Sequence, residues 1–243
     1  MEPNVLNFFD EQGNMLPLEE IQASVKNIYE EMSNEPMQKL YDSESILDTL
    51  IRPEEHIKTE DTVETLLFLE RGLYLYGVIT EETANAFRDA ITFWNKVDRI
   101  DGIPPEDRQP IKIFINSDGG DLPATLSIID LIQMSETPVW TINIGKAYSG
   151  GFFICIAGHK RFGYPSSTYL FHEGCRQDGG DAHKYLQGAS FYKKELELLK
   201  KIVLKHTNIS EEEYQEIKKD DLWLLADEAL KKNVIDEITE VII

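Results

Sequence analysis

Apolar and polar positions change period several times along residues 63–243, and the changes predict alternating strands and helices. Short runs rich in apolar and β-branched residues predict strands at 65–69, 73–76, 111–115, 139–144 and 168–171. Apolar residues at helical spacing predict helices after Thr80, at about 123–135 and at about 182–205. The repeated order of strand, glycine turn and helix is typical of an α/β fold, with a mostly parallel central sheet covered by helices.

The helix after Thr80 has a clear pattern. Thr80 is a favourable N-cap residue, and Glu81 and Glu82 follow in the first turn, where the helix dipole stabilises negative charge. Apolar residues then recur at helical spacing and predict a buried face, formed by Ala84, Phe87, Ile91 and Trp94.

Residues 1–62 differ from the rest of the chain and predict a separate N-terminal extension. The segment is acidic and shows no strand pattern, and apolar residues recur at helical spacing between residues 18 and 32. Residues 52–62 have the composition of a polar linker, so we expect the globular domain to span residues 63–243. Two interpretations of the mainly helical extension stay open, a docking arm or cover and a loosely packed addition.

Ser149 is the main candidate for chemistry, because it lies at a predicted strand-to-helix junction. Gly150 and Gly151 follow it, and the apolar residues after them predict a buried helix. At such a junction a serine is exposed to a reactant, and the first N–H groups of the helix can face a developing anion. We expect the two glycines to let a substrate backbone come close. Ala147 replaces the first glycine of the G-x-S-x-G pattern, and a serine that only caps the helix is the alternative.

Three further groups are expected near Ser149. Asn116–Gly120 ends a predicted strand, and parallel strands share one carboxyl edge, so this glycine turn should meet Ser149 in one cleft. His172 also ends a predicted strand and is the best placed of the five histidines, although a structural role is the alternative. Asp221 directly precedes the apolar segment Leu222–Leu225, so we expect it to be partly buried and able to orient an imidazole.

Charge and cysteine content narrow the classes of partner and compartment. The net charge of −20 argues against nucleic acid and anionic membranes as partners, because both are polyanions. The two cysteines favour a reducing compartment over a disulfide framework. No N-terminal signal pattern and no apolar stretch of membrane-spanning length is seen, so a cytoplasmic location is expected.

Several motifs resemble those of the proteolytic subunit of the Clp protease, in the crotonase-like superfamily. Asn116-Ser-Asp-Gly-Gly120 is similar to the family's N-S-P-G-G. Gly145-Lys-Ala-Tyr-Ser-Gly-Gly-Phe-Phe153 is similar to G-M-A-A-S-M-G-A-F, and Leu170-Phe-His-Glu173 is similar to M-I-H-Q.

The resemblance continues toward the C-terminus and covers about three quarters of the chain, from residue 63 to residue 241. His206-Thr207 is similar to the H-T-G motif, and Ala226-Asp-Glu-Ala229 is similar to A-P-E-A. Asp221 stands at the position of the family's catalytic aspartate, 49 residues after His172, without an insertion. The resemblance implies a Clp protease or crotonase-like fold, in which the long helix at about 182–205 protrudes.

The resemblance also implies a reaction, which is serine-dependent cleavage of peptides and unfolded polypeptides with no metal or other cofactor. In this scheme Ser149 is the nucleophile, His172 is the general base and then the acid, and Asp221 orients the imidazole. The backbone N–H groups of Gly120 and Gly150 form the oxyanion hole.

Assembly and a partner are implied in the same way. Members of the family form homo-oligomeric rings, two stacked heptamers, that are fed by an ATP-driven unfoldase of the AAA+ class. The unfoldase docks in apolar pockets on the ring face. The positions of this chain that correspond to the pocket residues are Phe114, Met134, Phe162 and Tyr164. Ordinary packing in the core or at an interface is the alternative for each of them.

The chain departs from the family pattern at positions that affect these expectations. Asp118 replaces the proline of the glycine turn, and Tyr148 adds bulk beside the serine. Lys219 and Asp220 reverse the order of an acid and an arginine that support ring stacking in the family.

Two other functions stay open. One is a non-catalytic subunit that assembles with a paralogue or an unfoldase, and the other is a protease with a lysine base, since Ser149–Phe153 also resembles the S-G-G-Y-Y of signal peptide peptidase.

Overall fold

The computed structural model describes residues 70–174, 181–217 and 220–242. The chain divides into two units, residues 1–62 and 63–243, and every described residue belongs to the second. The helices expected in the N-terminal extension and the strand expected at 65–69 lie outside the described residues. Within the described ranges, no helix has the length and apolar character needed to cross a membrane.

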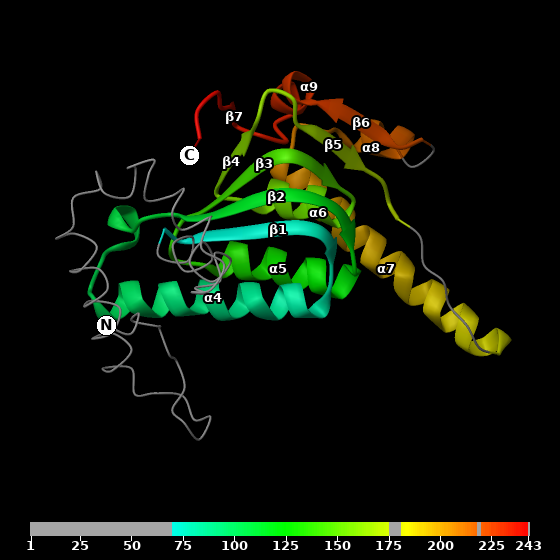
Figure 1. The fold of residues 1–243 in the computed structure, drawn as a ribbon. Helices are drawn as coiled ribbons and strands as arrows, with labels where there is room; N and C mark the ends of the chain where they lie inside the picture. The colour runs from blue at the N-terminus through cyan, green and yellow to red at the C-terminus, as the bar shows by residue number, and fades with distance from the viewer. Residues whose placement is uncertain (1–69, 175–180, 218–219, 243) are drawn as a thin grey trace, which may run out of the picture. The chain divides into compact units, whose positions relative to one another are not determined.

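A mostly parallel sheet forms the centre of the domain (Figure 1). Its strands are β1 (Gly72–Ile79), β2 (Ile111–Gly120), β3 (Val139–Tyr148), β4 (Lys160–Gly163), β5 (Thr168–Phe171), β6 (Leu222–Leu225) and β7 (Glu237–Ile238). Strands β1, β2, β3, β4 and β7 are neighbours in that order, and each pair is parallel. β5 runs parallel to the second half of β3, and β6 pairs with β5 in the antiparallel direction. The predicted α/β fold with a mostly parallel sheet is therefore confirmed.

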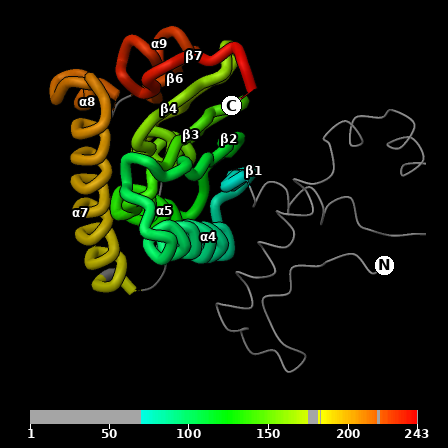
Figure 2. The backbone as a smooth tube through the Cα atoms, turned by 90° about the vertical axis from the view of Figure 1, so that its left-hand side faces the viewer, coloured from blue at the N-terminus to red at the C-terminus, as the bar shows by residue number. Residues whose placement is uncertain are grey.

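Helices pack against this sheet, and one long helix projects beyond it on one side. They are α4 (Glu81–Ile100), the 3₁₀ helix η2 (Pro105–Asp107), α5 (Leu122–Met134), α6 (Gly150–Ala157), α7 (Ala182–His206), α8 (Glu211–Ile217) and α9 (Ala226–Lys231). Helices α4 and α5 lie side by side below the sheet in Figure 1. Figure 2 shows α7 standing along one side of the layers, where it contacts α6.

The two faces of the sheet pack against different neighbours. In β2, Ile113 and Ile115 point into the main core, which the helices close. Phe114 points to the opposite face, as the two-residue period of a strand requires, and forms a small cluster with Ile142 and Phe162. The helix-covered face therefore carries most of the buried apolar surface.

Helix α4 follows the sequence pattern closely. The Thr80 hydroxyl accepts from the Thr83 N–H at 3.3 Å, and the Thr83 hydroxyl accepts from the Thr80 N–H at 3.3 Å, which completes a capping box. The predicted buried face is confirmed, since Ala84, Phe87, Ile91 and Trp94 are all buried.

Strands β2 and β3 are longer than predicted. Residues 116–120 were expected to form a turn, but they remain paired with β1 as far as the pair Ile79 and Gly120. The pairing of β2 with β3 shifts register between Ile115 and Ser117, which marks a local bulge. Pairing on both sides thus holds polar and glycine residues in a strand that their own propensities disfavour.

The predicted long helix is confirmed as α7, and its two halves differ in how far their apolar side chains are buried. Its C-terminal half packs into the core through Leu199 and Val203, which are buried. Its N-terminal half projects beyond the sheet (Figure 1) and exposes Tyr185, Leu186 and Phe191.

Candidate active site

Ser149 lies where β3 ends and α6 begins, and its backbone is strained. Its φ of 52° and ψ of −118° belong to a region that residues with a side chain rarely adopt, at a typical cost of about 1–3 kcal/mol. Its N–H donates to the Leu170 carbonyl at 2.9 Å, and its carbonyl accepts from the N–H groups of Phe152 and Phe153. Ser149 occupies the N-cap position of α6, but its hydroxyl makes no capping hydrogen bond. The alternative that Ser149 serves only as a helix cap is therefore not supported.

Gly119 and Gly120 bring the end of β2 against the Ser149 turn. Their φ angles of 92° and 158° favour glycine. A Cβ on Gly119 would lie 2.6 Å from the Ser149 Cβ, and one on Gly120 would lie 2.3 Å from the Ile79 carbonyl oxygen. The buried Ser117 hydroxyl holds this backbone, because it accepts from the Gly119 N–H at 3.0 Å and donates to a β1 carbonyl at 2.6 Å.

The direction in which a side chain would leave Gly150 and Gly151 is filled by protein, and the expectation that these glycines let a substrate backbone come close stays a prediction. A Cβ on Gly150 would lie 2.5 Å from the Thr125 Oγ1 atom. A Cβ on Gly151 would lie 3.3 Å from the Ser117 Cβ. Glycine at these positions allows the start of α6 to approach α5 and β2.

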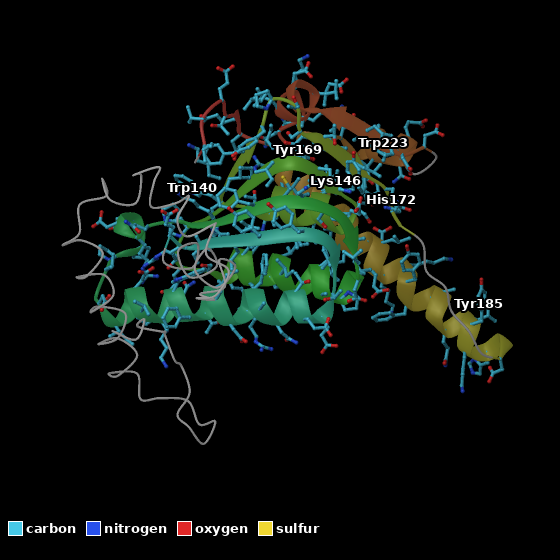
Figure 3. All side chains as sticks on the ribbon, in the orientation of Figure 1. Trp140, Lys146, Tyr169, His172, Tyr185 and Trp223 are labelled. Atoms are coloured by element: carbon cyan, nitrogen blue, oxygen red, sulfur yellow. The ribbon has the colours of Figure 1, made fainter. Side chains whose placement is uncertain are left out.

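A cavity of about 640 Å³ brings several predicted site residues together. Ser149, His172, Gly120 and Gly150 all line it. Figure 3 shows His172 at the edge of the sheet where β2 and β3 end, so the expected cleft at the carboxyl ends of the strands is present. The described residues contain no cluster of three or more His, Cys, Asp or Glu side chains that could hold a metal ion.

The backbones of Gly120 and Gly150 lie close together at the cavity wall. A Cβ on Gly150 would lie 3.4 Å from the Gly120 nitrogen, so the two residues are in close contact at the cavity wall. The N–H of Gly150 belongs to the first turn of α6, where no intrahelical acceptor exists. An anion at this position would also meet the positive end of the α6 dipole.

The segment after His172 is held by two tyrosines that sequence reasoning did not assign to the site. Tyr192 on α7 donates to the Glu173 carbonyl at 2.9 Å, and Tyr214 on α8 donates to a Glu173 carboxylate oxygen at 3.1 Å. Tyr214 is fully buried, and burial together with the Glu173 charge raises the pKa of its phenol above the ordinary value. Tyr192 lies within the helix predicted at about 182–205, and no spacing signal connects Tyr192 or Tyr214 with His172.

Asp221 lies opposite His172 by strand register but does not line the cavity. In the β5–β6 ladder, Leu170 pairs with Trp223 and Phe171 with Leu222, so the next step of the same register sets His172 opposite Asp221. Asp221 is exposed, and the expectation of partial burial is wrong, because the side chain lies just before β6, at the edge of the sheet. Among the described residues, no hydrogen bond joins Ser149, His172 and Asp221.

The four residues expected to form a docking pocket do not share one surface. Phe114 and Phe162 are buried in the small cluster, and Tyr164 packs against it. Phe114 and Tyr164 line a surface hollow of about 340 Å³, together with Tyr74 and other residues. Met134 is 81% exposed at the end of α5 and does not line that hollow.

The fold and the cavity define a parallel-sheet α/β protein with a serine and a histidine at the carboxyl edge of the sheet. A family model for the Clp protease matches residues 53–241. Two similar curated proteins carry the name ATP-dependent Clp protease proteolytic subunit 2. The one from Treponema pallidum (strain Nichols) is 31% identical over 134 residues, 54% of this chain and 67% of the relative. The one from Treponema denticola is 33% identical over 138 residues, with the same shares. The chain belongs to the Clp protease family.

Proposed function

We propose that this protein is a serine endopeptidase that cleaves peptides and unfolded polypeptides with Ser149, His172 and Asp221. The observation that carries the proposal is the Ser149 turn. Its serine adopts a strained conformation, makes no capping hydrogen bond and shares a cavity with His172. Strain that the surrounding structure maintains is typical of a functional position. Membership of a protease family supports the same reaction class.

The first half-reaction forms an acyl-enzyme. The Ser149 oxygen attacks the carbonyl carbon of the peptide bond while His172 takes the hydroxyl proton. The carbonyl oxygen becomes an oxyanion, and the N–H groups of Gly120 and Gly150 donate to it, each such donor being typically worth about 3 kcal/mol. The C–N bond then breaks, and the leaving amine receives the proton from the His172 imidazolium.

The second half-reaction releases the acyl group. Water attacks the ester carbon, and His172 takes a proton from the water. The same two N–H groups stabilise the second oxyanion, and the C–O bond to Ser149 breaks as its oxygen regains the proton. Asp221 is proposed to hold the imidazole in the required tautomer, and the β5–β6 register supports this role.

One part of the cavity wall is apolar and supports binding of an apolar substrate side chain next to the bond that is cleaved. Leu122, Phe153 and Leu199 form part of its wall, and the latter two are almost fully buried. A substrate side chain that displaces water from such a wall gains about 25 cal/mol for each Å² of apolar surface buried.

We also propose that the protein acts as the proteolytic subunit of a cytoplasmic, ring-shaped, ATP-dependent protease. The printed names of its relatives, which describe ATP-dependent subunits, support this proposal. The exposed apolar half of α7 supports self-association, and the aromatic hollow formed in part by Phe114 and Tyr164 supports docking of an unfoldase.

Labelling with a fluorophosphonate tests the proposal, because this reagent phosphonylates only an activated serine. The wild-type protein should be labelled on Ser149, and Ser149→Ala should not be labelled. Ser210→Ala is the matched control, since Ser210 is an exposed serine that caps α8 away from the cavity, and this variant should be labelled like the wild type. A wild-type protein that stays unlabelled while folded would favour the non-catalytic subunit, and dependence on a lysine in place of His172 would favour the signal-peptide-peptidase-like reaction.

A further inference from the structure

Asp118 places a negative charge at the wall of the proposed active site. It immediately precedes Gly119 and Gly120, and it lines the same cavity as Ser149. Its carboxylate accepts a hydrogen bond from the Lys146 ammonium group at 2.5 Å. Lys146 lies on β3, three residues before Ser149, and Figure 3 shows it at the same end of the sheet as His172.

The charges around the cavity make this ion pair relevant to the chemistry. The cavity is lined by the carboxylate residues Asp118, Asp121, Glu173 and Glu195, and no lysine or arginine of the described residues lines it. The reaction proposed above creates a further negative charge on the substrate oxygen, beside the Gly120 N–H. A carboxylate near that oxygen raises the energy of the transition state, because like charges repel.

Lys146 offsets the charge of Asp118, which lies two residues before the oxyanion donor Gly120, whereas Asp121 directly follows that donor. Asp121 also has a partner, since it accepts from the N–H of Ala124 as the N-cap of α5, but that partner carries no formal charge. The Lys146 ammonium lies outside the lining of the cavity, so it can neutralise Asp118 without occupying space needed by a substrate.

The same ion pair joins the two turns that must stay aligned. Asp118 belongs to the end of β2 that carries the Gly120 amide, and Lys146 belongs to β3, which ends directly before Ser149. The turns touch at Gly119, which has no room for a Cβ against Ser149. A misplacement of about 1 Å in such an arrangement can cost on the order of a hundredfold in rate.

We propose that Lys146 is a positioning residue for the peptidase reaction, because it neutralises the Asp118 carboxylate beside the oxyanion donors. This inference rests on the proposed function. Exposed ion pairs contribute little to stability, and here the Asp118 and Lys146 side chains are 55% and 36% exposed. The effect is therefore expected on the chemical step and not on folding.

The test compares kcat, KM and the second-order rate of fluorophosphonate labelling in four variants. Lys146→Met should lower kcat and the labelling rate by about 10-fold with KM nearly unchanged, because it leaves Asp118 unpaired near the oxyanion. Lys146→Arg should restore most of the rate, since it keeps the charge. The double variant Asp118→Asn/Lys146→Met should be faster than Lys146→Met alone. Raising the salt to about 1 M should help Lys146→Met more than the wild type, because the screening length falls to roughly 3 Å.

Lys160→Met is the matched control. Lys160 pairs with Glu237 at 3.4 Å with side chains 44% and 54% exposed, but it lies at the start of β4, at the opposite edge of the sheet. This variant should be labelled at the wild-type rate.

The inference fails if Lys146→Met matches the wild type, or if the double variant is as slow as Lys146→Met. Absence of labelling on Ser149 in the wild type would instead remove the proposed function, and the inference with it.

Discussion

Ser149 and Gly119 depend on each other at the scale of single residues. Ser149 adopts an unfavourable backbone conformation, which hydrogen bonds with β5 and α6 maintain. Gly119 has no side chain and so leaves space for the Cβ of Ser149. Neither feature follows from residue type alone. The serine and the glycine were recognised from their positions at predicted strand ends, whereas the φ of 52° and the missing capping bond come from tertiary contacts.

Asp221 is the residue whose assignment most needs a test. The antiparallel register sets it opposite His172, while Asp220 is one step out of register. Side chains alternate between the two faces of a paired segment, so only one of the two acids can share a face with His172. Asp221→Asn should lower kcat by roughly 10³-fold or more, because the wrong imidazole tautomer is then favoured.

Asp220→Asn is the control for this prediction, and it should retain most of the activity. Circular dichroism should show both variants folded, since Asp220 and Asp221 are exposed. If Asp220→Asn is the inactive variant, the register argument is wrong by one residue.

At the scale of elements, β6 is one of three strands, with β4 and β7, that the sequence pattern did not identify. Leu222–Leu225 is a run of four apolar residues without alternation, of which only Leu224 is buried. Its strand form depends on antiparallel pairing with β5, and Trp223 packs edge-on against Tyr148 with ring centroids 5.3 Å apart. Tyr148 departs from the family pattern. Its ring contact with Trp223 links β3, which precedes Ser149, to β6, which follows Asp221.

The C-terminal end of α7 should make stability depend on pH. His206 is half-buried there, and burial, followed by the charges of Lys205, Arg161 and His159, lowers its pKa below the ordinary value of 6.5. These effects outweigh the attraction of the helix C-terminus for a cation. The unfolded chain therefore binds a proton more readily than the folded chain, and stability falls as the pH drops below about 6.5 toward the lowered pKa.

Urea unfolding of the full chain at pH 7.5 and at pH 5.5 would measure this effect. His206→Gln should lose less stability between these two pH values than the wild type, because glutamine does not titrate. His183→Gln, an exposed histidine near the start of the same helix, should behave like the wild type. Equal losses in all three proteins would assign the pH dependence to other groups.

At the scale of the whole molecule, the described domain exposes apolar surface on α7 beyond its own core. Tyr185, Leu186 and Phe191 are each more than half exposed on the helix. Figure 3 shows Tyr185 on the part of α7 that projects beyond the sheet. The same helix carries Tyr192 and Leu199, which line the cavity, so contacts made by its projecting half act on an element of the proposed site.

Peptidase activity per subunit should therefore rise with protein concentration, as rings associate through α7. The protein alone should cleave short peptides slowly and folded proteins not at all. Light scattering and peptide hydrolysis measured over the same concentration range would test this. Activity that stays proportional to concentration while the mass changes would show that the site does not depend on assembly.

The sequence by itself determined the α/β class, strands β1, β2, β3 and β5, the long helices, the carboxyl-edge cleft and the positions of Ser149 and His172 at strand ends. These follow from local periodicity and from the rule that parallel strands share one edge, so no long-range contact is needed to predict them. The tertiary structure alone decided the strain at Ser149 and the exposure of Asp221. It also decided the hydrogen bonds from Tyr192 and Tyr214 to Glu173 and the Asp118–Lys146 ion pair. Each of these depends on which distant segments pack together, and side-chain contacts between distant segments leave no periodic trace in the chain.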